Sequence, residues 1–152
     1  MEYRGNFCSK ERRFLSNMFK AKMTINNIEF HSVEQYYMFM KSDDLNYQEQ
    51  ILNEKDPQKC KTLSRKLLKK NGYQKKEWEK IKVDIMDEAV FEKFTQNPEL
   101  LERLKNVPDE ELVETNNWGD TFWGVDIDTG VGEDKLGESL RLTKMFLGDL
   151  LA

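Results

Sequence analysis

The chain has 152 residues, of which 38% are hydrophobic and 34% are charged, and its formal net charge at pH 7 is −4. This length and balance are typical of one soluble domain with a hydrophobic core, and no apolar run reaches the roughly 18 residues that a membrane-spanning helix needs. The first four residues lack the apolar stretch of a signal peptide, so the sequence predicts a cytoplasmic protein with no membrane partner.

Cysteine and histidine usage limits the possible chemistry. Cys8 and Cys60 lie far apart without a C-x-x-C motif, and we expect both to be free, buried thiols in a reducing cytosol. His31 is the only histidine, which excludes a histidine-rich metal site. Because no G-x-S-x-G motif is present either, a Ser-His-Asp hydrolase is disfavoured.

The N-terminal part is predicted to be extended in two places. Residues 3–8 and 22–30 both look like strands, and the Asn26-Asn27 pair within the second range tolerates the left-handed turn of a hairpin. The sequence therefore predicts a β-hairpin before the first helix.

Between these ranges, Phe14-Leu15-Ser16-Asn17-Met18-Phe19 alternates apolar and polar residues in a predicted loop. We expect a turn that buries Leu15 and Phe19. Ser16 and Asn17 are candidates for polar contacts to a ligand.

The segment from Ser32 to Lys41 is the most unusual in the chain. Ser32 with Gln35 fits a capping box, and the run from Tyr36 to Met40 is apolar on nearly every side, as in a buried helix. Glu34 and Lys41 are seven residues apart, close to two helical turns, so both would lie on one face. Buried charges are costly unless paired or bound. They indicate either a structural pair at the edge of the core or an acid and an amine at the floor of a cleft.

Helical patterns dominate the rest of the chain. A capped helix is expected from Asp56-Pro57 to Gly72, a second from Trp78 to the break at Asn97-Pro98, a short one before Pro108 and a final one from about Asp134. Residues 112–115 form a possible strand, and residues 116–132 a loop. The inward-facing side chains are predicted to be Leu63, Leu67, Leu68, Trp78, Ile81, Ile85, Ala89, Phe94, Leu100, Leu101, Leu104, Leu136, Leu140, Leu147 and Leu150. We therefore predict one α+β domain over residues 1–152, predominantly helical, with small β-hairpin elements.

The predicted loop contains Asn117-Trp118-Gly119-Asp120-Thr121-Phe122-Trp123-Gly124, with two of the three tryptophans. Such a loop is either a stacking surface for a ligand or a packed plug over a site. Gly119 would let the backbone pass close to a ligand, and Asp120 could bind a ribose hydroxyl or act as an acid or base.

Charge is distributed unevenly. Residues 55–82 hold eleven basic and three acidic side chains, and residues 87–138 hold fifteen acidic and four basic ones. This pattern indicates either solvated helix faces of opposite sign or a basic rim that steers a phosphate-bearing substrate.

Taken together, these motifs resemble the NADAR (YbiA-like) family over nearly the whole chain. The landmarks are Phe14-Leu15-Ser16-Asn17, Ser32-Val33-Glu34 with Tyr36 and Lys41, Pro57 with Arg65, Trp78 with Met86, Lys93-Phe94-Thr95-Gln96-Asn97, Leu112-Val113-Glu114, Trp118 to Gly124, and Leu136-Gly137. Each piece is weak alone, but eight in register are specific. The sequence departs from the family's usual residues at Met18, Gln35 (often His) and Ser64 (often Gly), and none of these is the glutamate or the lysine.

The resemblance implies a YbiA-like fold and N-glycosidase activity. Some family members cleave phosphorylated riboflavin-pathway intermediates, and others remove ADP-ribose from modified guanine in nucleic acid. It further implies that Glu34 and Lys41 are the family's acid and lysine.

Cleaving an N-glycosidic bond requires a proton for the leaving base and a group that stabilises or traps the anomeric carbon. We expect Glu34 to handle the proton and Lys41 either to form a Schiff base with the sugar or to act as a cation, with Asp120 as a third catalytic candidate. Substrate contacts are expected from Ser16, Asn17, Tyr36, Arg65, Trp118, Gly119 and Trp123. No metal or cofactor is implied.

The predicted function is therefore hydrolysis of ADP-ribosyl or ribosyl-phosphate N-glycosides, either nucleic-acid-linked or small molecules. The alternative is a non-catalytic ADP-ribose or nucleotide-binding module. A helical interaction protein is disfavoured by the charges on the buried helix and by the tryptophans of the loop.

Overall fold

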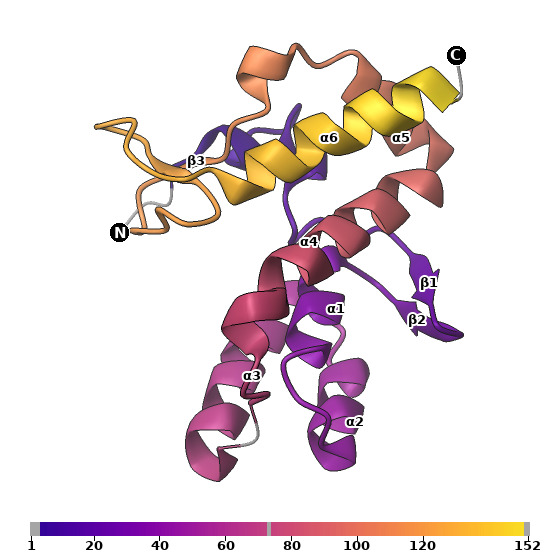
Figure 1. Cartoon of the computed structure of the whole chain (residues 1–152), viewed down its shortest axis with the longest axis vertical. Coiled ribbons are helices and arrows are strands. Elements are labelled where there is room, and N and C mark those ends of the chain that lie inside the picture. The colour runs from indigo at the N-terminus through magenta and orange to yellow at the C-terminus, as the bar shows by residue number, and fades with distance from the viewer. Residues whose placement is uncertain (1–3, 73, 151–152) are drawn as a thin grey trace. The chain divides into compact units, whose positions relative to one another are not determined.

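The computed structural model describes residues 4–72 and 74–150, with the side chains of residues 71, 149 and 150 left aside. These residues form six α-helices, three short 3₁₀ segments and two two-stranded sheets (Figure 1). The predicted α+β class, predominantly helical with small sheets, is confirmed. The chain divides into two compact units: residues 17–96, and the residues up to 16 together with those from 97 onwards. A single domain over residues 1–152 stays a prediction.

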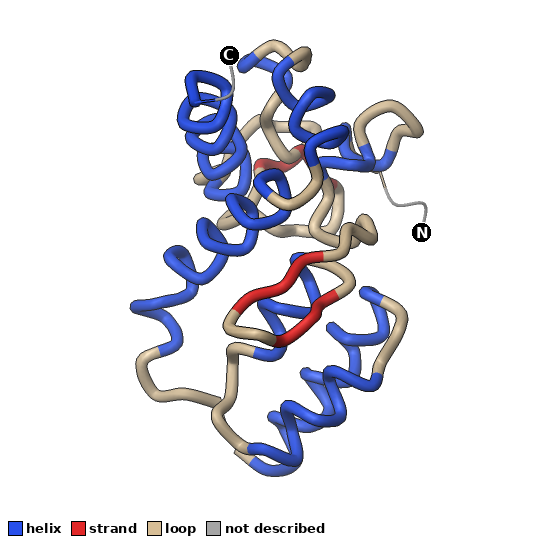
Figure 2. The backbone as a smooth tube through the Cα atoms, turned by 90° about the vertical axis from the view of Figure 1, so that its right-hand side faces the viewer, coloured by secondary structure: helices blue, strands red, loops and turns tan. Residues whose placement is uncertain are grey.

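The unit of residues 17–96 begins with the predicted hairpin. Strands β1 (Met23–Ile25) and β2 (Ile28–Phe30) pair antiparallel, with Met23 opposite Phe30, and they form the longer red pair of the tube in Figure 2. Asn26 and Asn27 have φ values of 52° and 66°, so the turn is left-handed at both positions, as the sequence predicted.

Helix α1 (Val33–Phe39) is the centre of this unit. Its Ser32 cap accepts a hydrogen bond from the Gln35 N–H at 3.1 Å, and all seven of its residues are buried. It packs against α2, α3 and α4, which explains why its sequence is apolar on nearly every side. The buried helix and the Ser32 cap are confirmed. The capping box is only half confirmed, because the Gln35 side chain accepts the N–H of His31, one residue before the cap.

Helix α2 (Leu45–Asn53) was missed in the sequence. Its start is signalled by Asp44, whose carboxylate accepts the Tyr47 N–H at 2.8 Å. The Tyr47 hydroxyl then bonds the Met38 carbonyl at 2.7 Å and the Ser64 hydroxyl at 2.6 Å, which ties α2 to its neighbours. Only Tyr47 and Ile51 of α2 are fully buried, so the apolar signal of the helix is weak.

Helices α3 (Pro57–Asn71) and α4 (Trp78–Thr95) complete the unit, and both lie within the bounds predicted for these helices. Asp56 caps α3, and Gly72 ends it with a left-handed φ of 64°. The expected inward stripe of α3 is only half-buried; the buried face is Pro57, Cys60 and Ser64. Small side chains face inward because α3 packs against α1, whose large rings fill the space between them.

The other unit contains α5 (Pro98–Lys105), α6 (Lys135–Leu150) and the parallel pair β3 (Thr115–Asn116) and β4 (Val125–Asp126). Its 3₁₀ segments are Asn6–Cys8, Arg13–Leu15 and Asp109–Glu111. Leu136, Leu140 and Leu147 are buried on α6, as predicted, and the side chain of Leu150, the fourth predicted residue, lies outside the described part.

Three local predictions in this unit need correction. The segment predicted as extended over residues 3–8, of which Tyr3 lies outside the described part, is a 3₁₀ turn at Asn6–Cys8 because the Asn6 side chain bonds the backbone of Val113 and Thr115. The strand expected over residues 112–115 begins only at Thr115, and part of the predicted loop is β4. Cys60 is a buried free thiol as expected, but Cys8 is exposed.

No helix within residues 4–72 and 74–150 is long and apolar enough to cross a membrane. Aromatic side chains form much of the core of residues 17–96. Phe30 packs edge-on against Tyr36 and Phe39, at ring-centroid distances of 5.0 and 5.2 Å.

Candidate active site

Glu34 lies in the first turn of α1, where the helix dipole favours a negative charge. The residue is 6% exposed, and its backbone N–H donates to the Asn17 carbonyl at 3.1 Å. The segment before β1 is thereby fastened to the start of α1. A carboxyl group is thus held at the edge of an aromatic core, where solvation of its charge is reduced.

Lys41 does not lie on α1, which corrects the geometric part of the prediction. The helix ends at Phe39, and the Lys41 N–H bonds the Met38 carbonyl at 3.2 Å in a tighter turn. The side chain is half-buried, with Nζ 5.4 Å from the ring centroid of Tyr37 and 5.9 Å from that of Trp78. The amine therefore sits against aromatic surface and not in bulk water.

The pKa of Lys41 is lowered, first by burial of the amine. The Glu34 carboxylate opposes this shift, whereas the positive charges of Lys61, Arg65 and Lys82 add to it. The sequence had left open which effect prevails; in the fold burial outweighs the attraction of Glu34. The opposing effect also shows that Glu34 and Lys41 are close enough to interact, as the sequence predicted, although they do not share a helix.

The three cations around Lys41 come from two helices. Lys61 and Arg65 are one turn apart on α3, with Arg65 exposed, and Lys82 is one turn from Trp78 on α4. The Lys82 ammonium bonds the Glu79 carboxylate at 2.6 Å. These positions form a basic rim at Lys41, consistent with the predicted rim for a phosphate-bearing substrate.

Two further predicted contacts, Tyr36 and Asn17, lie in the same unit. Tyr36 is fully buried and its hydroxyl donates to Glu88; burial, followed by this bond, raises the pKa of the phenol far above its usual value. The Asn17 amide donates to the Met86 sulfur at 3.5 Å. The substrate-binding roles of both residues stay predictions, and each also has a structural bond.

The two buried departures from the family pattern have structural roles. The Gln35 side chain accepts from the His31 N–H at 2.8 Å and donates to the Ile51 carbonyl at 3.1 Å, which links the start of α1 to the end of α2. The Ser64 hydroxyl bonds Tyr47, a bond that glycine cannot make. Gln35 therefore has a defined packing role that does not require a titrating group.

The remaining predicted residues belong to the other unit. Ser16 ends the 3₁₀ segment Arg13–Leu15, and its N–H donates to the Arg13 carbonyl at 3.0 Å. The Asp120 Oδ1 accepts the N–H groups of Phe122 and Trp123 at 3.1 and 2.9 Å, so this carboxylate shapes the turn. Its catalytic role stays a prediction.

The Asn116 side chain holds the same loop in place through hydrogen bonds to the backbone of Asp120. It is completely buried, its Oδ1 accepts the Asp120 N–H at 3.1 Å, and its amide donates to the Asp120 carbonyl at 2.8 Å. Gly119 has a φ of 84°, which few other residues adopt without strain. Trp118 is 37% exposed, whereas Trp123 is half-buried and packs edge-on against Phe122 at 4.8 Å.

Sequence reasoning missed one unusual side chain, Lys93 on α4. It is 1% exposed, with Nζ 5.2 Å from the Phe94 ring centroid and 5.8 Å from that of Phe19. Burial lowers its pKa to about 7. Lys93 follows Met86, Ala89 and Val90 at helical spacing on the buried face of α4. A lysine in this otherwise apolar pattern was the signal in the sequence that could have revealed its burial.

Within residues 4–72 and 74–150, no group of three or more His, Cys, Asp or Glu side chains could hold a metal ion. The groups that lie around Lys41 in residues 17–96 are its own amine, the carboxyl of Glu34, the rings of Tyr37 and Trp78, and the cations of Lys61, Arg65 and Lys82. This set can exchange protons, offer a nucleophilic amine and attract a phosphate.

Comparison with known proteins identifies the family of this chain. The model of the NADAR domain matches residues 5–147. The chain belongs to the NADAR domain family. The NMR structure of the Escherichia coli protein YbiA superposes with a TM-score of 0.78 at 24% identity, covering 95% of this chain and 84% of YbiA, which confirms the predicted YbiA-like fold.

Curated relatives share more sequence with this NADAR domain. A riboflavin biosynthesis protein of Vibrio vulnificus is 34% identical over 131 residues, 86% of this chain and 34% of the relative. An N-glycosidase of Nostoc punctiforme is 35% identical over 78 residues, covering 51% of this chain and 49% of the relative. An N-glycosidase of Acanthamoeba polyphaga mimivirus is 32% identical over 100 residues, covering 64% and 56%. The chain thus spans between a third and just over half of the length of these relatives.

Proposed function

We propose that this NADAR domain is an N-glycosidase that hydrolyses ribosyl-phosphate or ADP-ribosyl N-glycosides. The observation that carries the proposal is the half-buried Lys41 amine, held against Tyr37 and Trp78 within electrostatic reach of the buried Glu34. Two relatives are named N-glycosidases, which supports the reaction class.

In the proposed reaction, the bond between the base nitrogen and the anomeric carbon breaks while the Lys41 nitrogen bonds to that carbon. The base leaves with a proton from Glu34, and the sugar ring opens to a Schiff base on Lys41. Water then hydrolyses the Schiff base and regenerates the amine. The balance is substrate plus water giving the base with its nitrogen protonated and either ribose phosphate or ADP-ribose, so no oxidant or cofactor enters.

The lowered pKa of Lys41 supports this role, because only the neutral amine is a nucleophile. The basic rim of Lys61, Arg65 and Lys82 suits a substrate that carries phosphate. In this proposal Trp118 or Trp123 stacks on the base, and Asp120 binds a ribose hydroxyl or assists proton transfer.

The substrate is tested by incubation with ADP-ribosylated guanine in DNA and, separately, with a phosphorylated riboflavin-pathway intermediate. We expect release of ADP-ribose with restored guanine in the DNA, or release of the free base and ribose phosphate from the intermediate, in at least one of the two incubations. Tight binding with no cleavage of either substrate would instead favour the ADP-ribose-binding module.

The covalent step is tested by adding borohydride during turnover and mapping the adduct by mass spectrometry. We expect a reduced sugar adduct on Lys41 and not on the lysines of residues 55–82. Lys75→Arg is a matched control, because the Lys75 side chain is only 12% exposed and pairs with Asp43 at 3.3 Å in the same unit. Near-normal turnover of Lys41→Arg would show that a cation suffices, and the covalent step would be wrong.

A further inference from the structure

Helix α3 concentrates positive charge in a chain whose net charge is −4. Its 15 residues include six cations and no acidic side chain. The cations are Lys59, Lys61, Arg65, Lys66, Lys69 and Lys70. The basic rim at Lys41 uses only two of them, Lys61 and Arg65, so the remaining four need a separate explanation.

The cations of α3 point away from the core of their unit. Lys61 is half-buried and the other five are exposed, whereas the buried face of the helix is Pro57, Cys60 and Ser64. With 3.6 residues per turn, the cations fall into two neighbouring rows that together cover about half of the helix circumference. The rows are Lys61-Arg65-Lys69 and Lys59-Lys66-Lys70. We call this surface the basic face of α3.

The charges of the basic face are not neutralised by neighbouring acids. Among the residues that the structure describes, no ion pair joins an acidic side chain to any of the six cations. An excess of positive charge on one surface attracts anions and speeds their association.

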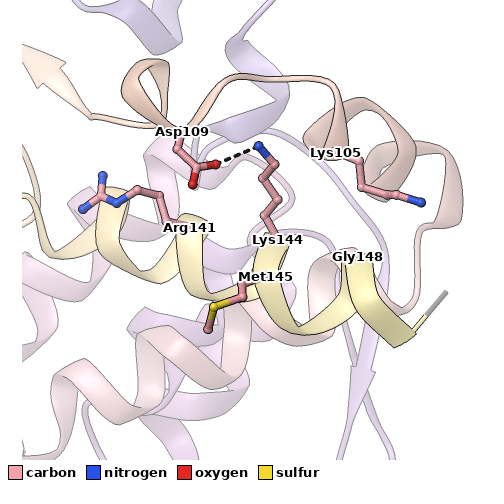
Figure 3. A pocket seen from close by; sticks show the side chains of 6 residues that line it. All are labelled: Lys105, Asp109, Arg141, Lys144, Met145 and Gly148. Atoms are coloured by element: carbon pink, nitrogen blue, oxygen red, sulfur yellow. Dashed lines mark hydrogen bonds and ion pairs between the residues drawn. The ribbon is translucent and has the colours of Figure 1, made fainter. Parts of the chain in front are cut away.

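The cations near α6 show the opposite arrangement. Three of them line a surface hollow of about 350 Å³, where Figure 3 shows Lys105 and Arg141 pointing apart. Each is neutralised by an acidic side chain. The pairs are Lys144–Asp109 at 2.7 Å, Arg141–Asp134 at 3.1 Å and Lys105–Glu102 at 3.7 Å. Unpaired positive charge is therefore a property of α3 and not of every basic cluster in this protein.

The length of the basic face indicates a ligand with many negative charges. From Lys59 to Lys70 the helix rises by about 17 Å, at 1.5 Å per residue. The phosphates of a ribose phosphate or of ADP-ribose would contact one or two turns of the helix and leave the rest unused. A ligand that contacts the whole face must carry a series of phosphates or other anions.

The side chains of α3 favour nucleic acid over a lipid surface. A helix that binds a membrane inserts exposed apolar side chains beside its basic ones. The leucines of α3 are only half-buried at best towards solvent, and no described apolar side chain of the helix is exposed. A nucleic acid strand needs no such insertion, because Lys and Arg bind its regularly spaced phosphates.

We propose that the basic face of α3 binds the phosphodiester backbone of a nucleic acid strand, independently of base sequence. One end of this face lies at Lys41, since Lys61 and Arg65 act on its amine and the Lys75 N–H, just after α3, donates to the Lys41 carbonyl at 2.8 Å. A bound strand therefore passes beside the candidate active site. Binding requires no turnover and does not rest on the proposed N-glycosidase activity.

The test is fluorescence anisotropy of the full chain with a labelled single-stranded oligothymidylate of about 16 nucleotides, long enough for one binding site. We expect a dissociation constant of about 1–100 μM at physiological salt. A peptide nucleic acid of the same sequence, whose backbone is uncharged, should not bind. Equal binding of both strands, or binding of phosphatidylserine vesicles without binding of oligothymidylate, would overturn the proposal.

A triple variant locates the contact on α3. Lys59→Gln, Lys69→Gln and Lys70→Gln together remove three charges outside the basic rim. The plot of log affinity against log salt should become shallower by about two, since each phosphate contact on a single strand contributes about 0.7 to the slope. Replacing the same three lysines by Arg keeps the charges and should keep the slope.

The matched control removes the same number of charges elsewhere. Lys10→Gln, Lys20→Gln and Lys22→Gln replace three exposed lysines outside α3, and this variant should bind like the wild type. An equal loss of slope in the control would show a general charge effect, and unchanged binding of the α3 glutamine variant would place the contact elsewhere. Either result would contradict the proposal, whether or not the protein cleaves an N-glycoside.

Discussion

Around α1 a carboxyl and an amine are held partly out of water against aromatic rings, whereas in the loop of residues 116–124 a carboxylate bonds the backbone of its own turn. Burial lowers the pKa of Lys41, and the Glu34 carboxylate opposes this shift. Asp120, by contrast, already accepts two N–H groups. We therefore assign proton transfer in the proposed reaction to the first region, whereas the Asp120 carboxylate shapes its own loop, in which Trp118 is exposed.

The largest expected effect is on turnover, from Glu34→Gln. The amide keeps the size of the side chain but cannot deliver the proton, and loss of general acid–base help costs about a hundredfold or more. Initial rates with whichever of the two candidate substrates is cleaved measure this. The matched control is Glu29→Gln on the exposed side of the hairpin, which should keep full activity. If the Glu34→Gln variant folds and is fully active, Glu34 does not supply the proton, and the region around α1 cannot be distinguished from the loop by its role in proton transfer.

The second prediction concerns stability and uses Lys93. Its ordinary pKa of 10.5 applies to the unfolded chain, and its pKa in the fold is about 7. Between these pH values the unfolded chain binds a proton that the fold does not, so Lys93 makes the free energy of unfolding rise with pH from about 7 to 10.

Lys93→Met should remove this rise and stabilise the protein at pH 6 by roughly 2–4 kcal/mol, because a buried ammonium is no longer required. Urea unfolding at pH 6 and pH 9 measures both effects. Lys66→Met, at an exposed position on α3, is the control. A slope that persists in Lys93→Met would show that Lys93 titrates normally.

The third prediction tests the loop. If Trp118 stacks on the base, Trp118→Ala should weaken ligand binding by about tenfold, since base–aromatic stacking contributes roughly 1–3 kcal/mol. Calorimetry with ADP-ribose measures this. Asp120→Asn retains an oxygen for the N–H groups of Phe122 and Trp123, so the turn should persist and only an acid–base role would be lost. A large loss of turnover in Asp120→Asn would show that the loop also takes part in the chemistry.

The smallest expected effect is a shift in pH dependence. If turnover needs neutral Lys41, the rate rises with pH up to the lowered pKa of that amine. Lys61→Gln removes a neighbouring positive charge, so this pKa rises and the rate–pH curve moves to higher pH by a few tenths of a unit, as expected for one screened charge. The neighbouring Lys66→Gln should leave the curve in place. Identical curves for both variants would show that the rim does not act on Lys41.

Local signals in the sequence were sufficient for much of the fold. The Ser32 cap, the Asn26-Asn27 turn, and the Asp56 and Gly72 helix ends were all predictable, because each is satisfied by bonds or backbone angles within a few residues. The family could also be inferred, since its motifs span the chain in order. Helix α2 has clear ends, but only two of its residues are buried, so its apolar pattern is weak and the helix was missed.

Tertiary packing decided what no local pattern contains. Helical periodicity placed Glu34 and Lys41 on one helix face, yet α1 stops at Phe39, and the amine is held by the Tyr37 and Trp78 rings. The burial of Lys93 likewise depends on segments far apart in sequence. The same is true of the interaction of Lys61 and Lys82 with Lys41, and of the surface hollow lined by Lys105 and Arg141. Solvation and charge–charge distances are properties of packed side chains, so the sequence determined which groups are present and the fold determined their pKa values.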